Sequence, residues 1–105
     1  MVQKRIEVKK LANDTAVVGR YLGGVLRKMT VEALSQVDEV VVDFDGIEML
    51  TQSSADEFVS RIMREDESMI DKIHFKHCMP RVKQMIQWAV DNADSVLQHQ
   101  NAFQV

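Results

Sequence analysis

The segment 39–45, EVVVDFD, places the strongest constraint on the fold of this 105-residue chain. Its three consecutive valines are β-branched and apolar, and they favour a strand that is buried on both faces, as in the centre of a parallel sheet. Successive parallel strands are joined by crossover connections, which are usually helices. The segment therefore predicts an α/β fold.

Hydrophobic periodicity supplies the other elements. Alternating apolar and charged residues predict strands, and apolar residues three or four positions apart predict helices. The expected strands lie within residues 2–11, 39–45 and 72–79, and the expected helices over residues 17–36, 54–64 and 80–97. The order βαβαβα predicts a small layered domain, with a mostly parallel sheet and helices packed mainly on one face. Glycine and proline are scarce, so we expect residues 1–105 to form a single domain.

Composition narrows the function classes. The net charge of −3 argues against a nucleic-acid binder, which usually has a strongly basic face. The start MVQKRIEVKK lacks the apolar stretch of a secretory signal, and no segment approaches the roughly 18 apolar residues of a membrane span. The single Cys78 cannot form an internal disulfide, so we expect a cytoplasmic protein.

Two sequence motifs that are common in enzymes are absent from this chain. It contains no glycine-rich phosphate loop and no Gly-x-Ser-x-Gly motif. His74 and His77 are three residues apart on an expected strand, and their side chains should point to opposite faces, which disfavours a shared metal. We therefore expect no catalytic residues, no metal and no cofactor.

A second interpretation rests on three carboxylates. Asp43 and Asp45 share one face of the expected strand, and Asp56 opens the following helix. Grouped carboxylates are the hard oxygen ligands that Mg²⁺ prefers. The alternative function is therefore a small magnesium-dependent phosphotransfer or receiver-like domain. A homo-oligomeric scaffold, with a homodimer as its simplest form, is a further alternative.

Hydroxyl side chains gather in the turn that follows the valine strand. Thr51, Ser53 and Ser54 lie there, and Ser54 with Glu57 three residues later predicts a capping box at the helix start. A phosphate is favoured at a helix N-terminus, and it would add roughly −1.5 to −2 charges to this surface. Asp56 and Glu57 would then oppose it by like charge.

The segment VVVDFDGIEMLTQSSADEFVSRI resembles the core of STAS domains, the fold of bacterial anti-sigma factor antagonists. It is most similar to a STAS-like group of unknown function, whose strand ends in Asp-Phe-x-Gly and whose helix begins with Ser-x-Ala-Asp-Glu. The stretch KIHFKHCMPRVKQMIQWAV is similar to the third strand and last helix of that group. The resemblance covers roughly residues 15–90.

The resemblance implies a non-enzymatic regulatory module. Antagonists of this kind bind a GHKL-type ATPase that acts as a kinase and phosphorylates a serine, which ends the complex. Ser53 falls at that position, with Ser54 and Thr51 as alternatives, although Thr51 and Ser54 stand where the family has Asp and Gly. The implied partner-binding residues surround this turn: Glu48, Met49, Thr51, Gln52, Ser53, Ser54, Asp56 and Glu57.

Overall fold

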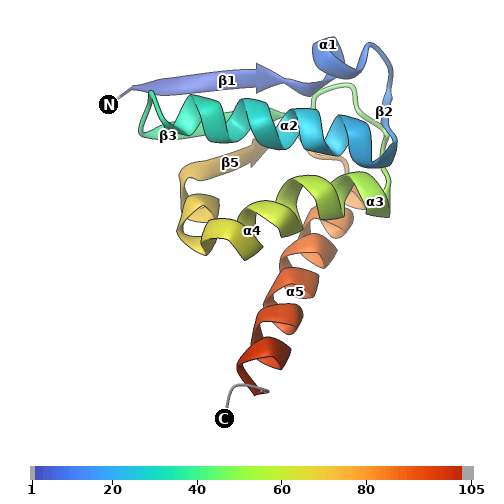
Figure 1. The fold of residues 1–105 in the computed structure, drawn as a ribbon. Coiled ribbons are helices and arrows are strands. Elements are labelled where there is room, and N and C mark those ends of the chain that lie inside the picture. Colours follow the sequence, from blue (N-terminus) through green and yellow to red (C-terminus); the bar gives the residue numbers. More distant parts are fainter. Residues whose placement is uncertain (1, 103–105) are drawn as a thin grey trace.

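The fold is a three-stranded parallel sheet with helices on one side, as the computed structural model of the chain shows (Figure 1). The model describes the backbone of residues 2–102 and the side chains of residues 2–94. The sheet consists of β1 (Gln3–Glu7), β3 (Glu39–Asp43) and β5 (Ile73–Lys76), in the order β1-β3-β5. The predicted α/β class and the predicted parallel sheet are confirmed, and the valine strand is the central one.

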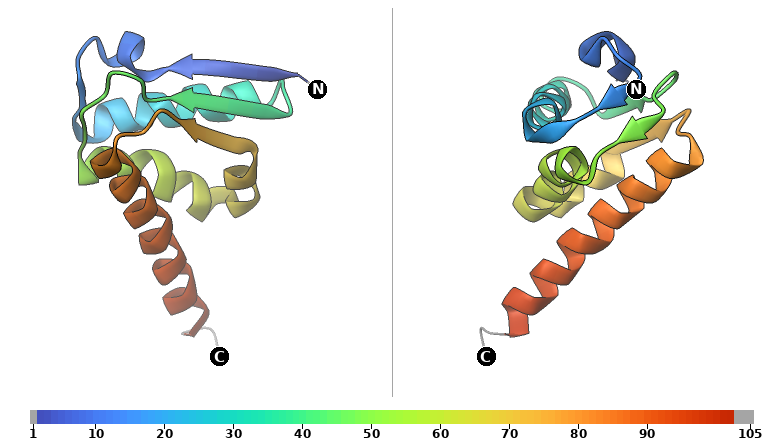
Figure 2. Two further views of the ribbon diagram at one scale, coloured as in Figure 1. Left: turned by 180° about the vertical axis from the view of Figure 1, so that it is seen from behind. Right: turned by 90° about the vertical axis from the view of Figure 1, so that its right-hand side faces the viewer.

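One face of the sheet forms the hydrophobic core. Ile6, Val42 and Phe75 lie side by side across the three strands, and all belong to the core cluster or pack against it. Helix α2 (Gly19–Leu34) and a continuous helix over residues 52–66 cover this face (Figure 2). The second helix contains α3 (Gln52–Ala55), a single π-helical turn η1 (Asp56–Ser60) and α4 (Arg61–Asp66), and then passes into a 3₁₀ segment η2 (Glu67–Lys72).

The opposite face of the sheet has no helix over it in the described part of the chain (Figure 2, left). Arg5, Val41 and His74 form a row across the three strands on this face. Val41 is nevertheless only 6% exposed. The predicted burial of the valine strand on both faces is therefore confirmed, although on this second face neighbouring side chains rather than a helix lie beside Val41.

Several element boundaries differ from the prediction, and three of the differences change an element. Residues expected to extend the first strand form a short helix α1 (Val8–Ala12), which ends at Asn13 in a left-handed conformation. The expected start of the second helix forms a two-residue strand β2 (Ala16–Val17) instead, which pairs in parallel with β4 (Met49–Leu50). The last helix, α5 (Pro80–Ala102), continues beyond residue 97.

Helix α5 packs across α3, η1 and α4, and it also contacts β4. Val82 and Ala89 of α5 are fully buried. Among the described helices, none is both long enough and apolar enough to cross a membrane. The packing of α5 places Trp88 and Asn92 beside the start of α3.

Candidate functional site

The candidate site lies where two connections run side by side, just before two helices begin. The parallel pairing of β2 and β4 brings the start of α2 next to the start of α3 (Figure 1). The Thr51 N–H donates to the carbonyl oxygen of Val17 at 3.0 Å, and the Gly19 N–H donates to Oγ1 of Thr51 at 3.1 Å. A pairing of two residues per strand thus fixes the turn that the sequence singled out.

Thr51, rather than Ser54, is the residue that caps the helix. Its Oγ1 accepts a hydrogen bond from the Ser54 N–H at 3.4 Å, and its backbone is extended. The predicted capping box of Ser54 with Glu57 is therefore wrong. The correct cap lies three residues earlier, because the β4 strand delivers Thr51 to the end of the helix with free N–H groups.

Ser54 is fully buried, with 0% of its surface exposed. Its hydroxyl lies 3.0 Å from the Val17 carbonyl oxygen and 2.8 Å from that of Thr51, and it accepts from the Thr51 hydroxyl at 2.9 Å. A partner or a kinase cannot reach this oxygen in the folded protein. The structure therefore removes Ser54 from the predicted contact face and from the alternative phosphorylation sites.

Gly23 explains why Ser54 is fully buried. A Cβ atom added at Gly23 would lie 2.3 Å from the carbonyl oxygen of Ser54 and 2.9 Å from its Cα. The backbones of α2 and α3 are therefore in direct contact, and only glycine permits this approach. The glycines of this helix are compatible with a break or with a close approach to a neighbour, and the structure shows a close approach at Gly23, with Ser54 as the neighbour.

An ionic network covers the outer side of this helix pair. Asp56 pairs with Arg20 at 2.8 Å and with Arg64 at 3.4 Å. Burial raises the pKa of the Asp56 carboxyl, but the hydrogen bond from Arg20 and the charge of Arg64 outweigh burial and lower the pKa below its usual value. Asp56 is therefore an ionised carboxylate whose negative charge is compensated by Arg20 and Arg64.

Glu57 is held by arginines in the same way. Its carboxylate lies 2.8 Å from Arg27, 3.0 Å from Arg61 and 3.4 Å from Arg20. The hydrogen bond from Arg27 is the main reason that the pKa of Glu57 is lowered. Because arginines neutralise both Asp56 and Glu57, the expected repulsion of a phosphate by these two residues is weak.

An open groove of about 580 Å³ joins the turn to α5. Ser53 is half-buried in this groove, whereas Gln52 is exposed. Trp88, which lies off the main apolar stripe of its helix, forms part of the wall. The groove is lined by Arg20, Thr51, Gln52, Ser53, Asp56, Trp88 and Asn92. Four of the eight predicted partner-binding residues therefore lie together, and the structure adds Arg20, Trp88 and Asn92.

Exposed apolar side chains flank the same turn. Val18 is 58% exposed, Tyr21 is 83% exposed and Met49 is 46% exposed. Val18 immediately follows β2, and Met49 belongs to β4, the strand that pairs with β2. Glu48, another predicted contact residue, is also exposed. Val18 and Tyr21 could not be recognised as exposed from the sequence, because their spacing matches the apolar stripe of the helix expected over residues 17–36.

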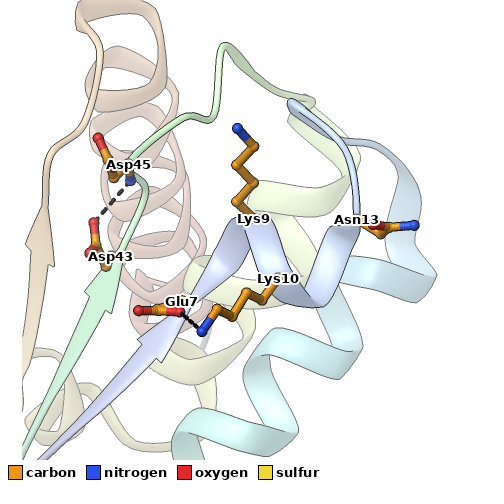
Figure 3. A pocket seen from close by; sticks show the side chains of 6 residues that line it. All are labelled: Glu7, Lys9, Lys10, Asn13, Asp43 and Asp45. Carbon is orange, nitrogen blue, oxygen red and sulfur yellow. Dashed lines mark hydrogen bonds and ion pairs between the residues drawn. The ribbon is translucent and has the colours of Figure 1, made fainter.

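The carboxylates of the magnesium alternative do not come together. Asp43 and Asp45 line a pocket at the carboxyl ends of β1 and β3, together with Glu7, Lys9, Lys10 and Asn13 (Figure 3). Asp56 instead belongs to the arginine network beside α2. Within the described residues, no group of three His, Cys, Asp or Glu side chains could hold a metal ion.

Asp43 is the most constrained acid of that pocket. Arg5 forms an ion pair with it, the Asp45 N–H donates to Oδ1 at 2.9 Å, and His77 Nδ1 lies 2.9 Å from Oδ1. Burial raises the pKa of the Asp43 carboxyl, but these hydrogen bonds outweigh burial and lower the pKa to about 2.

A sequence model of the STAS-like domain of unknown function (DUF4325) matches residues 23–83. No curated protein and no solved structure matches the chain. The matched span is more than half of the 105 residues and includes the turn at Thr51, Ser53 and Ser54. Arg20, Tyr21 and Trp88 lie outside it.

Proposed function

Because the chain belongs to the family of STAS-like domains of unknown function, we propose that it is a non-enzymatic regulatory module that binds a protein partner. Its docking face is defined here as the groove at residues 51–53 together with an exposed rim, which consists of Val18, Tyr21 and Met49. The observation that carries the proposal is the composition of this face: Arg20 and Trp88 line the groove, and Tyr21, the residue after Arg20 in α2, is 83% exposed. Tryptophan, tyrosine and arginine are the residues most enriched at interface hot spots.

The expected partner is a GHKL-type ATPase, as the resemblance to anti-sigma factor antagonists implies. The rim offers such a partner apolar contacts at Val18, Tyr21 and Met49. The groove offers polar groups at Thr51, Gln52 and Asn92. Taken as a whole, non-obligate protein interfaces mix apolar and polar surface in this way.

Phosphorylation of Ser53 is the expected switch. Ser53 is half-buried and lies two residues after the cap Thr51, where the free N–H groups of a helix favour an anion. Arg20 lines the same groove and pairs with Asp56 at 2.8 Å. A phosphate on Ser53 would compete with Asp56 for Arg20, and this competition would change the docking face.

Site-specific photo-crosslinking in the cell of origin tests the docking face. A photoreactive amino acid at Gln52, which is exposed in the groove, should capture an ATPase. The same group at Glu67, which is exposed beyond the far end of the same helix, is the control. Equal capture from both positions, or capture of a second copy of the chain from Gln52, would contradict the proposal.

A further inference from the structure

Asp43 and His77 form a hydrogen-bonded pair at the carboxyl ends of two adjacent strands. Asp43 is the last residue of β3, and His77 directly follows β5. Nδ1 of His77 lies 2.9 Å from Oδ1 of Asp43. His77 has a φ angle of 56°, a left-handed conformation that is uncommon for a residue other than glycine. The sequence expectation that His74 and His77 point to opposite faces fails because this conformation breaks the alternation of the strand.

The environment of Asp43 fixes the tautomer of His77. Arg5 and the Asp45 N–H donate to the same carboxylate, and an ionised carboxylate only accepts hydrogen bonds. Nδ1 of His77 must therefore carry the hydrogen and donate it. In the neutral ring this leaves the lone pair on Nε2, and the His77 side chain is 58% exposed, whereas that of Asp43 is 8% exposed.

A buried carboxylate that accepts from Nδ1 prepares Nε2 for attack. The hydrogen bond fixes the tautomer and the orientation of the ring, so that the lone pair stays on the opposite nitrogen. It also stabilises the positive charge that develops in the ring when Nε2 forms a bond. Here the carboxylate is itself held by Arg5, so that Asp43 cannot turn away from His77 without losing an ion pair.

The charges around His77 can accommodate a bound phosphoryl group. Lys76 precedes it and is exposed, and Arg5 is partly exposed on the other side of Asp43. The 23-residue helix α5 begins three residues later at Pro80, and the first turn of a helix carries free N–H groups. The opposing charges nearby are that of the Asp43 carboxylate itself and that of Asp45, which lines the same pocket as Asp43.

We propose that Nε2 of His77 is a phosphoryl acceptor, with Asp43 as its positioning residue. The lone pair of Nε2 forms the new N–P bond, and the bond between phosphorus and the leaving group breaks, with its electron pair going to the leaving group. With phosphoramidate as donor, ammonia leaves. The ring then bears a positive charge and retains the Nδ1 hydrogen, which is shared with the Asp43 carboxylate.

The other described histidine lacks this arrangement. Nε2 of His74 is buried, and it lies 3.3 Å from the Glu39 carboxylate without forming an aligned hydrogen bond. Its position on β5 opposite Val41 places it within an edge strand, before the carboxyl end of that strand. His74 is therefore the matched comparison within the same chain.

Reaction with phosphoramidate tests the site without any partner protein. The full chain is treated at neutral pH, and the modified residue is mapped by mass spectrometry under alkaline conditions, where phosphohistidine survives. We expect His77 to be modified first, ahead of His74, His99 and free N-acetylhistidine, and ³¹P and ¹⁵N NMR should place the phosphoryl group on Nε2. Loss of the positioning carboxylate in Asp43→Asn should slow the reaction on the order of tenfold.

The variants His77→Gln and His74→Gln complete the experiment. His77→Gln should remove the fast reaction, and His74→Gln should leave it unchanged. Modification of His74 or His99 at the same rate as His77, attachment at Nδ1, or a folded Asp43→Asn variant that reacts at the wild-type rate would each overturn the proposal. If Asp43→Asn does not fold, the comparison of His77 with N-acetylhistidine decides. Because Ser53 and the ATPase play no part in the reaction, its result is independent of the proposed docking function.

Discussion

Gly23 sets the distance between α2 and α3, because a Cβ atom there would lie 2.3 Å from the carbonyl oxygen of Ser54. The neighbouring Gly24 is different, since its nearest contact would be Cγ of Glu57 at 3.7 Å. Two consecutive glycines in one helix therefore have different roles. The sequence shows both glycines, but only the packing distinguishes them.

This difference predicts opposite effects of the same substitution. Gly23→Ala should lower the free energy of unfolding by about 1–3 kcal/mol, because the added methyl group overlaps backbone atoms that cannot rotate away. Gly24→Ala should be neutral or stabilising by up to about 1 kcal/mol, because alanine favours the helix. Urea unfolding followed by circular dichroism measures both, and equal effects would show that α2 and α3 are not in contact at Gly23.

Asp43 gives a prediction about acid stability. The pKa of its carboxyl is about 2 in the folded protein and 3.8 in the unfolded chain, so the unfolded state binds more protons between these values. The contribution is therefore fully present above about pH 4 and is lost as the pH falls towards 2, at about 2 kcal/mol in total.

Unfolding experiments at several pH values measure this contribution. Between pH 4 and pH 2 the stability of Asp43→Asn should fall less steeply than that of the wild-type protein, because asparagine does not titrate. The remaining slope comes from other acids with lowered pKa values, such as Asp56 and Glu57. Parallel curves for the two proteins would contradict the assignment of Asp43 as a strongly hydrogen-bonded carboxylate.

At the scale of elements, long periodic segments were predictable and short paired ones were not. The valine strand β3 and the helices α2 and α5 follow from local patterns of apolar residues. Strands β2 and β4 contain two residues each and exist only because they pair across 33 positions of the chain. The helix cap at Thr51 depends on that pairing, which is why the sequence pattern assigned it to Ser54.

The cap at Thr51 predicts a graded series of variants. Thr51→Ala should destabilise the protein by about 1–2 kcal/mol, because it removes the acceptor for the Gly19 and Ser54 N–H groups. Thr51→Ser keeps the hydroxyl and should cost less. Ser53→Ala should change stability by less than about 0.5 kcal/mol, because Ser53 makes one long contact with Thr51 at 3.4 Å.

Thermal or urea unfolding of the three variants gives the order directly. A larger loss for Ser53→Ala than for Thr51→Ala would mean that Ser53 is a structural residue. Ser53 would then be a poor position for a regulatory phosphate. The expected order leaves Ser53 free for regulation, whereas Thr51 and Ser54 hold the turn in place.

At the scale of the whole molecule, the fold brings together the residues of two candidate sites. The proposed docking face lies where the starts of α2 and α3 meet, and the Asp43–His77 pair lies at the carboxyl ends of β3 and β5. The hydroxyl turn could be predicted as a candidate site, since its residues are contiguous. The position of Arg20, Trp88 and Asn92 beside this turn could not be predicted, because the fold brings them to the groove from two other helices.

Titration of the partner captured at Gln52 decides whether that partner binds beside the turn at residues 51–53. The purified partner is added to the wild-type protein and to the variants Tyr21→Ala and Glu67→Ala, and the dissociation constant is measured for each. Loss of an exposed aromatic anchor should weaken binding by about 2 kcal/mol, or roughly thirtyfold, and Glu67→Ala should bind as the wild type does. Wild-type affinity for Tyr21→Ala, or an equal loss for both variants, would contradict a docking face beside the turn at residues 51–53.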